Sequence, residues 1–166
     1  MTTPARVVIL PEGSDILQVI DIDLPEPGPY QVIVKQFASG VCHSQLHQMH
    51  SRRSSPVVLG HESTGVVLQT GNQVTHVCEG DTVMVTWVPR DASNTTRIPQ
   101  AASLTLADGK VAVSQNVFTW ADTTIADEQY VVKVGADINK HVTAIIGCAV
   151  MTGAGAVENT AGVKAG

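Results

Sequence analysis

Residues 60–74 read GHESTGVVLQTGNQV, and the rest of the sequence is best interpreted around this stretch. A short apolar strand is expected over Gly65–Gln69, bounded by glycine. A histidine and a carboxylate, His61 and Glu62, come just before that strand. The stretch therefore joins a β-strand to two side chains that can take part in metal or acid–base chemistry.

Short strand patterns separated by turns occupy the first two thirds of the 166 residues. Breaks rich in Pro and Gly, such as residues 25–29, end them. The expected strands are Arg6–Leu10, Ile16–Asp23, Tyr30–Ala38, Gly65–Gln69, Thr82–Val88, Lys110–Val113 and Glu128–Val134. Many short strands at fairly even spacing indicate a closed or nearly closed β-barrel.

Helical patterns are few. Ser44–His50 predicts one or two turns, and the Ala-containing stretches Lys140–Ile146 and Gly153–Ala161 predict helices toward the end of the chain. Asp91–Ala107 is expected to be a loop because it shows no period. Residues 1–166 are therefore expected to form a single domain, mainly β with short helices.

Composition argues against several functional classes. A net charge of −5 disfavours nucleic acid as a partner, and no apolar run reaches the ~20 residues of a membrane span. The first residues lack the pattern of a secretory signal, so a cytoplasmic protein with no membrane partner is expected. Three cysteines, an odd number, do not suggest a disulfide framework. Cys78, in a turn, is interpreted as a bystander.

Three residues far apart in the chain can form a metal centre. Cys42 lies in GVCHS, His61 in GHE and Cys148 in IGC. Two thiolates and one imidazole leave the fourth position of a tetrahedral ion open, which is typical of catalytic zinc and not of structural zinc. Alone, each residue would more often be an ordinary core residue, but the three together favour metal binding.

The stretch 60–74 resembles the zinc signature of medium-chain alcohol dehydrogenases. Residues 38–47 (ASGVCHSQLH) are similar to that family's first-ligand motif, and residues 80–83 (GDTV) and 146–153 (IGCAVMTG) match two more of its motifs. The resemblance covers nearly the whole chain in the right order. It implies the N-terminal GroES-like catalytic domain of an oxidoreductase that acts on a small alcohol or aldehyde.

The resemblance also implies roles for single residues. Cys42, His61 and Cys148 would ligate one catalytic zinc. Glu62 would lie beside the metal, Ser44 would hydrogen-bond the substrate hydroxyl, and His47 would end a proton relay. Trp87 would line the substrate pocket. His43 would lie near the cofactor pyrophosphate and Thr152 near its nicotinamide ring. Without the resemblance, Ser44 could equally be a helix cap, His47 a surface histidine and Trp87 a core residue.

Three features depart from the family. Gln45 stands where an Asp usually bonds the histidine ligand, and its amide oxygen could still accept a hydrogen bond, without the charge. Residues 91–107 contain no cysteine, so no structural zinc is expected. Gly153-Ala154-Gly155 is not a dinucleotide-binding motif, since a third Gly and a preceding strand are missing. NAD or NADP would therefore need a separate cofactor domain.

Two kinds of function stay open. The chain is expected to be the catalytic part of a zinc-dependent alcohol dehydrogenase, truncated or split and inactive alone. The alternative is a non-catalytic zinc-binding GroES-like module or a metal-free scaffold. An apolar face at the border of a missing domain predicts self-association or binding of a separate cofactor domain.

Overall fold

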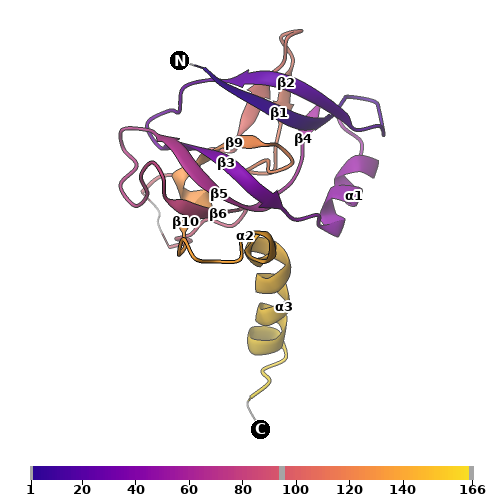
Figure 1. Ribbon diagram of the computed structural model, residues 1–166. Coiled ribbons are helices and arrows are strands. Elements are labelled where there is room, and N and C mark those ends of the chain that lie inside the picture. Colours follow the sequence, from indigo (N-terminus) through magenta and orange to yellow (C-terminus); the bar gives the residue numbers. More distant parts are fainter. Residues whose placement is uncertain (1, 94–95, 165–166) are drawn as a thin grey trace.

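The computed structural model describes residues 2–93 and 96–164, which form two five-stranded β-sheets and a helical segment (Figure 1). One sheet has, in spatial order, β2 (Gln18–Leu24), β1 (Thr3–Leu10), β4 (Val57–Val58), β8 (Val111–Val113) and β7 (Ser103–Thr105). The other has β10 (Val131–Lys133), β6 (Thr82–Thr86), β5 (Glu62–Thr70), β3 (Gln31–Ser39) and β9 (Thr123–Asp127). The mainly β fold with short helices, predicted from the sequence, is confirmed.

The two sheets meet along the chain just before β9. The backbone N–H of Val8, in β1, donates to the carbonyl of Trp120 at 2.8 Å. The N–H of Gln36, in β3, donates to the carbonyl of Asp122 at 2.9 Å. Residues 120–122 therefore bond to both sheets, but the strands stay divided between two sheets and do not close into the expected single barrel.

Side chains of β3 alternate between two buried clusters. Ile33 packs in the first cluster, which also contains Phe118. Val32 and Val34 pack in the second cluster, together with Val83 of β6. Each such buried side chain contributes about 1.5–3 kcal/mol, so both faces of this central strand stabilise the position of its end at Ser39.

Several strand boundaries differ from the prediction. β9 was not predicted, because its sequence, TTIAD, contains three polar residues and shows neither an apolar run nor alternation, although all five residues are buried. β7 lies within residues 91–107, which were predicted to be a loop. The expected strand Glu128–Val134 begins as a 3-10 turn, η1 (Glu128–Tyr130), because the Asp127 side chain accepts the Gln129 N–H at 3.0 Å and caps that turn.

The helix predicted over Ser44–His50 is confirmed as α1 (His43–His50). The two later helices are parts of one helical segment, made of α2 (Lys140–Thr143), η2 (Ile146–Val150), α3 (Met151–Gly155) and η3 (Ala156–Thr160), in which η2 and η3 are π-helical. Its first part, α2 and η2, packs against β3, β5 and β6, and α3 extends away from the sheets (Figure 1). Within the described part of the chain, no helix is long and apolar enough to cross a bilayer.

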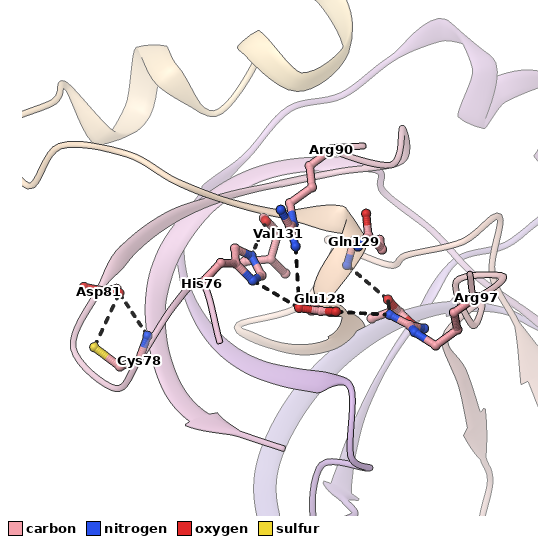
Figure 2. A network of polar contacts seen from close by, with 9 residues as sticks. His76, Cys78, Asp81, Arg90, Arg97, Glu128, Gln129 and Val131 are labelled. Carbon is pink, nitrogen blue, oxygen red and sulfur yellow. Dashed lines mark hydrogen bonds and ion pairs between the residues drawn. The ribbon is translucent and has the colours of Figure 1, made fainter. Parts of the chain in front are cut away.

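Ion pairs tie residue 97 to η1 (Figure 2). Arg97 binds both carboxylate oxygens of Asp127, and its Nη2 lies 2.9 Å from Oδ1. The Glu128 carboxylate lies near three basic side chains. Its Oε1 is 3.4 Å from Nη2 of Arg97, and its Oε2 is 3.7 Å from Nη2 of Arg90 and 3.1 Å from Nδ1 of His76. Burial raises the pKa of Asp127, but bonds from Arg97 and nearby backbone N–H groups outweigh burial and leave that pKa below its usual value. The cysteine-free segment around Arg97 is therefore held to η1 by charge.

Candidate metal centre

β3 and β5 bring the first two predicted ligands together. The antiparallel register pairs Ser39 with Ser63, and the Gly40 N–H donates to the Glu62 carbonyl at 3.0 Å. Cys42 follows the end of β3 by three residues, and His61 directly precedes β5. Antiparallel pairing therefore places the two ligands at the same end of the sheet.

Two glycines allow this close approach. A Cβ on Gly40 would lie 2.5 Å from Oε1 of Glu62, so no side chain fits there. Gly60 has φ of +88°, and a Cβ on it would lie 2.5 Å from Oγ1 of Thr119. Only glycine meets both demands without strain, which explains why a glycine precedes His61 and another precedes the Cys42 turn.

The third predicted ligand, Cys148, is positioned by contacts on either side of it in η2. The Thr86 hydroxyl donates to the Gly147 carbonyl at 2.7 Å, and the Ala149 N–H donates to Oε2 of Glu62 at 3.3 Å. The β5–β6 register pairs Glu62 with Thr86, so both anchors lie at one end of the sheet. Cys148, between them, is 7% exposed and faces the first two ligands.

The three donor atoms form a compact group. The ligand atoms of Cys42, His61 and Cys148 all lie within 4.8 Å of one another. The two sulfurs are 3.8 Å apart, and Nε2 of His61 is 3.2 Å from Sγ of Cys148. Tetrahedral zinc with Zn–S bonds of about 2.3 Å separates its sulfurs by about 3.8 Å. The group therefore fits zinc, and three ligands leave one position for another molecule.

Burial and hydrogen bonds set the charges of the group. The Ser44 hydroxyl, followed by its backbone N–H, lowers the pKa of the Cys42 thiol. Burial raises the pKa of Cys148 to about 11. Burial also lowers the pKa of His61 and raises that of Glu62. A metal ion binds the neutral imidazole and the thiolate. The shifts of the His61 and Cys42 pKa values therefore favour metal binding, whereas the raised pKa of Cys148 means that an ion must displace the proton of that thiol.

Gln45 is buried between the two ligand segments. Its Oε1 accepts the backbone N–H of Cys42 at 2.8 Å, at the start of α1. Its Nε2 lies 2.6 Å from Nδ1 of His61. The expectation that the amide oxygen would be available to the histidine is wrong, because the Cys42 N–H already occupies it.

The other predicted site residues differ in how closely they approach the group. Ser44 is half-buried beside the Cys42 sulfur, and its Oγ makes no other hydrogen bond of good geometry within the described residues. The ring centroids of Trp87 and His61 are 6.3 Å apart. His43 and His47 are exposed on α1 with ring centroids 5.0 Å apart. Thr152 is exposed on α3, four residues after Cys148.

Two threonines that support the group were not singled out in the sequence. Thr86 holds η2, as described above. Thr119 bonds the backbone of Glu62 through its Oγ1 and lies 2.8 Å from the Ser39 hydroxyl. Neither belongs to a pattern that marks a site, so only their partners reveal their role. Cys78, interpreted as a bystander, is exposed and lies outside the group.

A surface groove of about 1000 Å³ lies elsewhere, along β1, β2 and residues 105–108. None of the three candidate ligands lines it. The candidate metal centre is therefore recognised by its donor atoms and not by the size of a cavity.

Comparisons with known proteins relate this chain to one family. The family model "Alcohol dehydrogenase GroES-like domain" matches residues 28–136. An alcohol dehydrogenase from Moraxella sp. is 40% identical over 87 residues, covering 50% of this chain and 26% of the relative. An S-(hydroxymethyl)glutathione dehydrogenase from Synechocystis sp. is 30% identical over 185 residues, covering 98% of this chain and 50% of the relative.

A solved structure shows the same fold. The crystal structure of an alcohol dehydrogenase zinc-binding domain protein from Burkholderia ambifaria superposes with a TM-score of 0.82 at 23% identity. The match covers 100% of this chain and 51% of that protein. The chain thus spans about half the length, or less, of the relatives it matches.

Proposed function

This chain belongs to the alcohol dehydrogenase GroES-like domain family, and from that premise we propose that it forms the catalytic-domain part of a zinc-dependent alcohol dehydrogenase. The observation that carries the proposal is the convergence of Cys42, His61 and Cys148, with sulfurs at the spacing that tetrahedral zinc requires. We propose one catalytic ion and no structural zinc, since residues 91–107 lack cysteine.

The residues around the centre support oxidation of an alcohol or reduction of an aldehyde. Zinc held by the three ligands would supply Lewis acidity toward the substrate oxygen. Ser44 would bond the substrate hydroxyl and accept its proton, because its Oγ is not engaged by nitrogen or oxygen among the described residues. His47, exposed on the same helix, would release that proton to solvent. Glu62 would stay beside the ligands as a buried carboxylate.

A nicotinamide cofactor would be held mainly by a further domain. We propose that residues 1–166 act with a dinucleotide-binding domain, because relatives of this chain are about twice its length. His43 and Thr152 would face the NAD or NADP bound there, and both are accessible. Trp87 would line the substrate pocket, since its ring is close to His61 and 44% exposed.

The proposed compartment is the cytoplasm. All three cysteines are free, which agrees with a reducing environment. A net charge of −5 disfavours nucleic acid as a partner.

Two measurements test the proposal. Metal analysis of the purified chain should find about one zinc per chain, and NAD or NADP with a primary alcohol should give no turnover. Supplying a cofactor domain from a relative, fused or in trans, should restore oxidation. Substantial activity of the chain alone would contradict the need for that domain.

The alternative function is a zinc-binding module or scaffold without catalysis. The amide of Gln45 facing His61 favours weaker metal binding than a carboxylate would give. A metal-free chain that folds fully and gains no activity from a cofactor domain would support the scaffold.

A further inference from the structure

Gln45 contacts both ligand segments at once, through the Cys42 backbone and the His61 ring. We propose that Gln45 limits the affinity of the centre for its metal by holding His61 in the tautomer that cannot bind it. This inference rests on the metal site proposed above. It concerns a contact behind the ligands and not the ligands themselves.

The orientation of the Gln45 amide follows from its backbone partner. The N–H of Cys42 can only donate, so the amide atom 2.8 Å away must be the oxygen. The atom 2.6 Å from Nδ1 of His61 is therefore the NH₂ group, which can only donate. Nδ1 must accept, and the single proton of the neutral imidazole must lie on Nε2. That nitrogen points at Cys148, 3.2 Å away.

Metal binding requires the opposite tautomer. An ion at Nε2 uses the lone pair of that nitrogen, so the proton of the neutral ring lies on Nδ1. Nδ1–H then faces the Gln45 NH₂, donor against donor. Rotating the amide would only move the conflict to the Cys42 N–H, because an amide has a single acceptor atom. Gln45 is 1% exposed, so water cannot easily replace the lost bond.

A carboxylate at this position would remove the conflict. Glutamate has the length of glutamine and offers two acceptor oxygens, one for the Cys42 N–H and one for Nδ1–H of His61. Carboxylate partners of metal-bound histidines typically strengthen affinity by about 10–100-fold. Gln45→Glu should therefore bind Zn²⁺ about 10–100-fold more tightly than the natural chain.

The affinity test uses Zn²⁺ alone, in competition with a chromophoric chelator. The matched control is Gln48→Glu, which adds the same charge on the same helix. Gln48 engages its neighbours through its backbone carbonyl, with no contact of its side chain to His61 among the described residues. This control should change the affinity less than about 3-fold. An equal gain in both variants would overturn the inference, because charge alone would then explain it.

A second readout needs no metal. Nitrogen-15 NMR of the metal-free chain, with a His61→Gln variant to assign the ring, reports which nitrogen carries the proton. The natural chain should show the Nε2–H tautomer and Gln45→Glu the Nδ1–H tautomer. An Nδ1–H ring in the natural chain would overturn the inference even if Gln45→Glu failed to fold.

The outcomes separate this inference from the metal site. If neither the natural chain nor Gln45→Glu binds Zn²⁺, the proposed metal centre fails and the inference fails with it. If both bind Zn²⁺ equally, the metal centre stands and the role of Gln45 is refuted. Gln45→Asp, one methylene shorter, is a second carboxylate variant for the same comparison.

Discussion

Nε2 of His61 lies 3.2 Å from Sγ of Cys148, although 87 positions separate the two residues. This contact depends on η2 being anchored to β6 and to Glu62 on either side of Cys148. Sγ of Cys148 also lies 3.8 Å from Sγ of Cys42, so two sulfurs and an imidazole nitrogen, the donor set of a three-ligand zinc site, are in contact. The contact therefore couples the docking of η2 to the assembly of the candidate metal centre.

Removing the third ligand should remove the metal. Cys148→Ser should lower the zinc content from about one ion per chain to near zero, because serine is a poor zinc ligand. Elemental analysis after gel filtration, with circular dichroism to check folding, measures this. Cys78→Ser is the control, since Cys78 is exposed and outside the group. Equal loss in both variants would contradict the assigned site.

The Thr86 hydroxyl should stabilise the docking of η2. Thr86→Val keeps the shape but removes the bond to the Gly147 carbonyl, which should cost about 1–2 kcal/mol and weaken zinc binding. Thr105→Val, at an exposed position of β7, is the control. Urea unfolding measures the first effect and chelator competition the second. Unchanged zinc affinity in Thr86→Val would argue against this anchor.

The approach of β3 to Glu62 should not tolerate a side chain. Gly40→Ala should destabilise the chain by about 1–3 kcal/mol, because the new Cβ would lie 2.5 Å from the Glu62 carboxylate. Gly153→Ala, in α3, has no heavy atom within 4 Å of its Cβ. It should be neutral or stabilising by up to about 1 kcal/mol. Thermal unfolding should separate the two variants; similar shifts would contradict the packing.

The Arg97 ion pair should stabilise the fold more than a surface pair. Arg97→Met leaves Asp127, with a side chain 1% exposed, without its partner. The cost of breaking a buried pair, about 3–5 kcal/mol, is reduced to about 1–3 kcal/mol because Arg97 is partly exposed. Arg6→Met, which breaks an exposed pair with Asp21, should cost less than about 1 kcal/mol at pH 7.

The same pair predicts a pH dependence. Because the folded pKa of Asp127 lies below its ordinary value of 3.8, its stabilisation is complete above that value and is lost as pH falls through the lowered pKa. The stability difference between the natural chain and Arg97→Met should therefore be largest near pH 7 and shrink below about pH 4. Urea unfolding of the natural chain and of Arg97→Met, near pH 7 and below about pH 4, measures this stability difference. A difference that does not change with pH would exclude the Arg97–Asp127 pair as its cause.

The helical segment should mediate self-association when no other domain covers it. It exposes apolar side chains at Ile145, Ile146, Val150, Met151 and Val157. Light scattering of the 166-residue chain should show dimers or larger species at high concentration, and Val150→Ser with Val157→Ser should reduce them. Ile16→Ser, at an exposed position outside this segment, should not. A strictly monomeric chain would count against the prediction.

Much of the fold could be predicted from the sequence because the patterns that mark strands and turns are local. β1, β3 and β6 carry short runs of apolar and β-branched residues bounded by turns, so their positions were predicted to within a few residues. β9 was not, since three of its five residues, Thr123, Thr124 and Asp127, are polar although they are buried, so its sequence shows no apolar run. The π-helical turn that carries Cys148 was also missed, because nothing in IGCAV distinguishes it from an ordinary loop between two helices.

The order of residue types along the chain determined which side chains could bind zinc: two cysteines and a histidine, each beside glycine or within a glycine-containing turn. Tertiary structure alone decided how Gln45 is used. Whether an amide presents its oxygen or its nitrogen to a histidine depends on which donor lies on its other side. That donor, the Cys42 backbone, reaches Gln45 at the start of α1, while the β3–β5 register brings His61 to the opposite side of the amide.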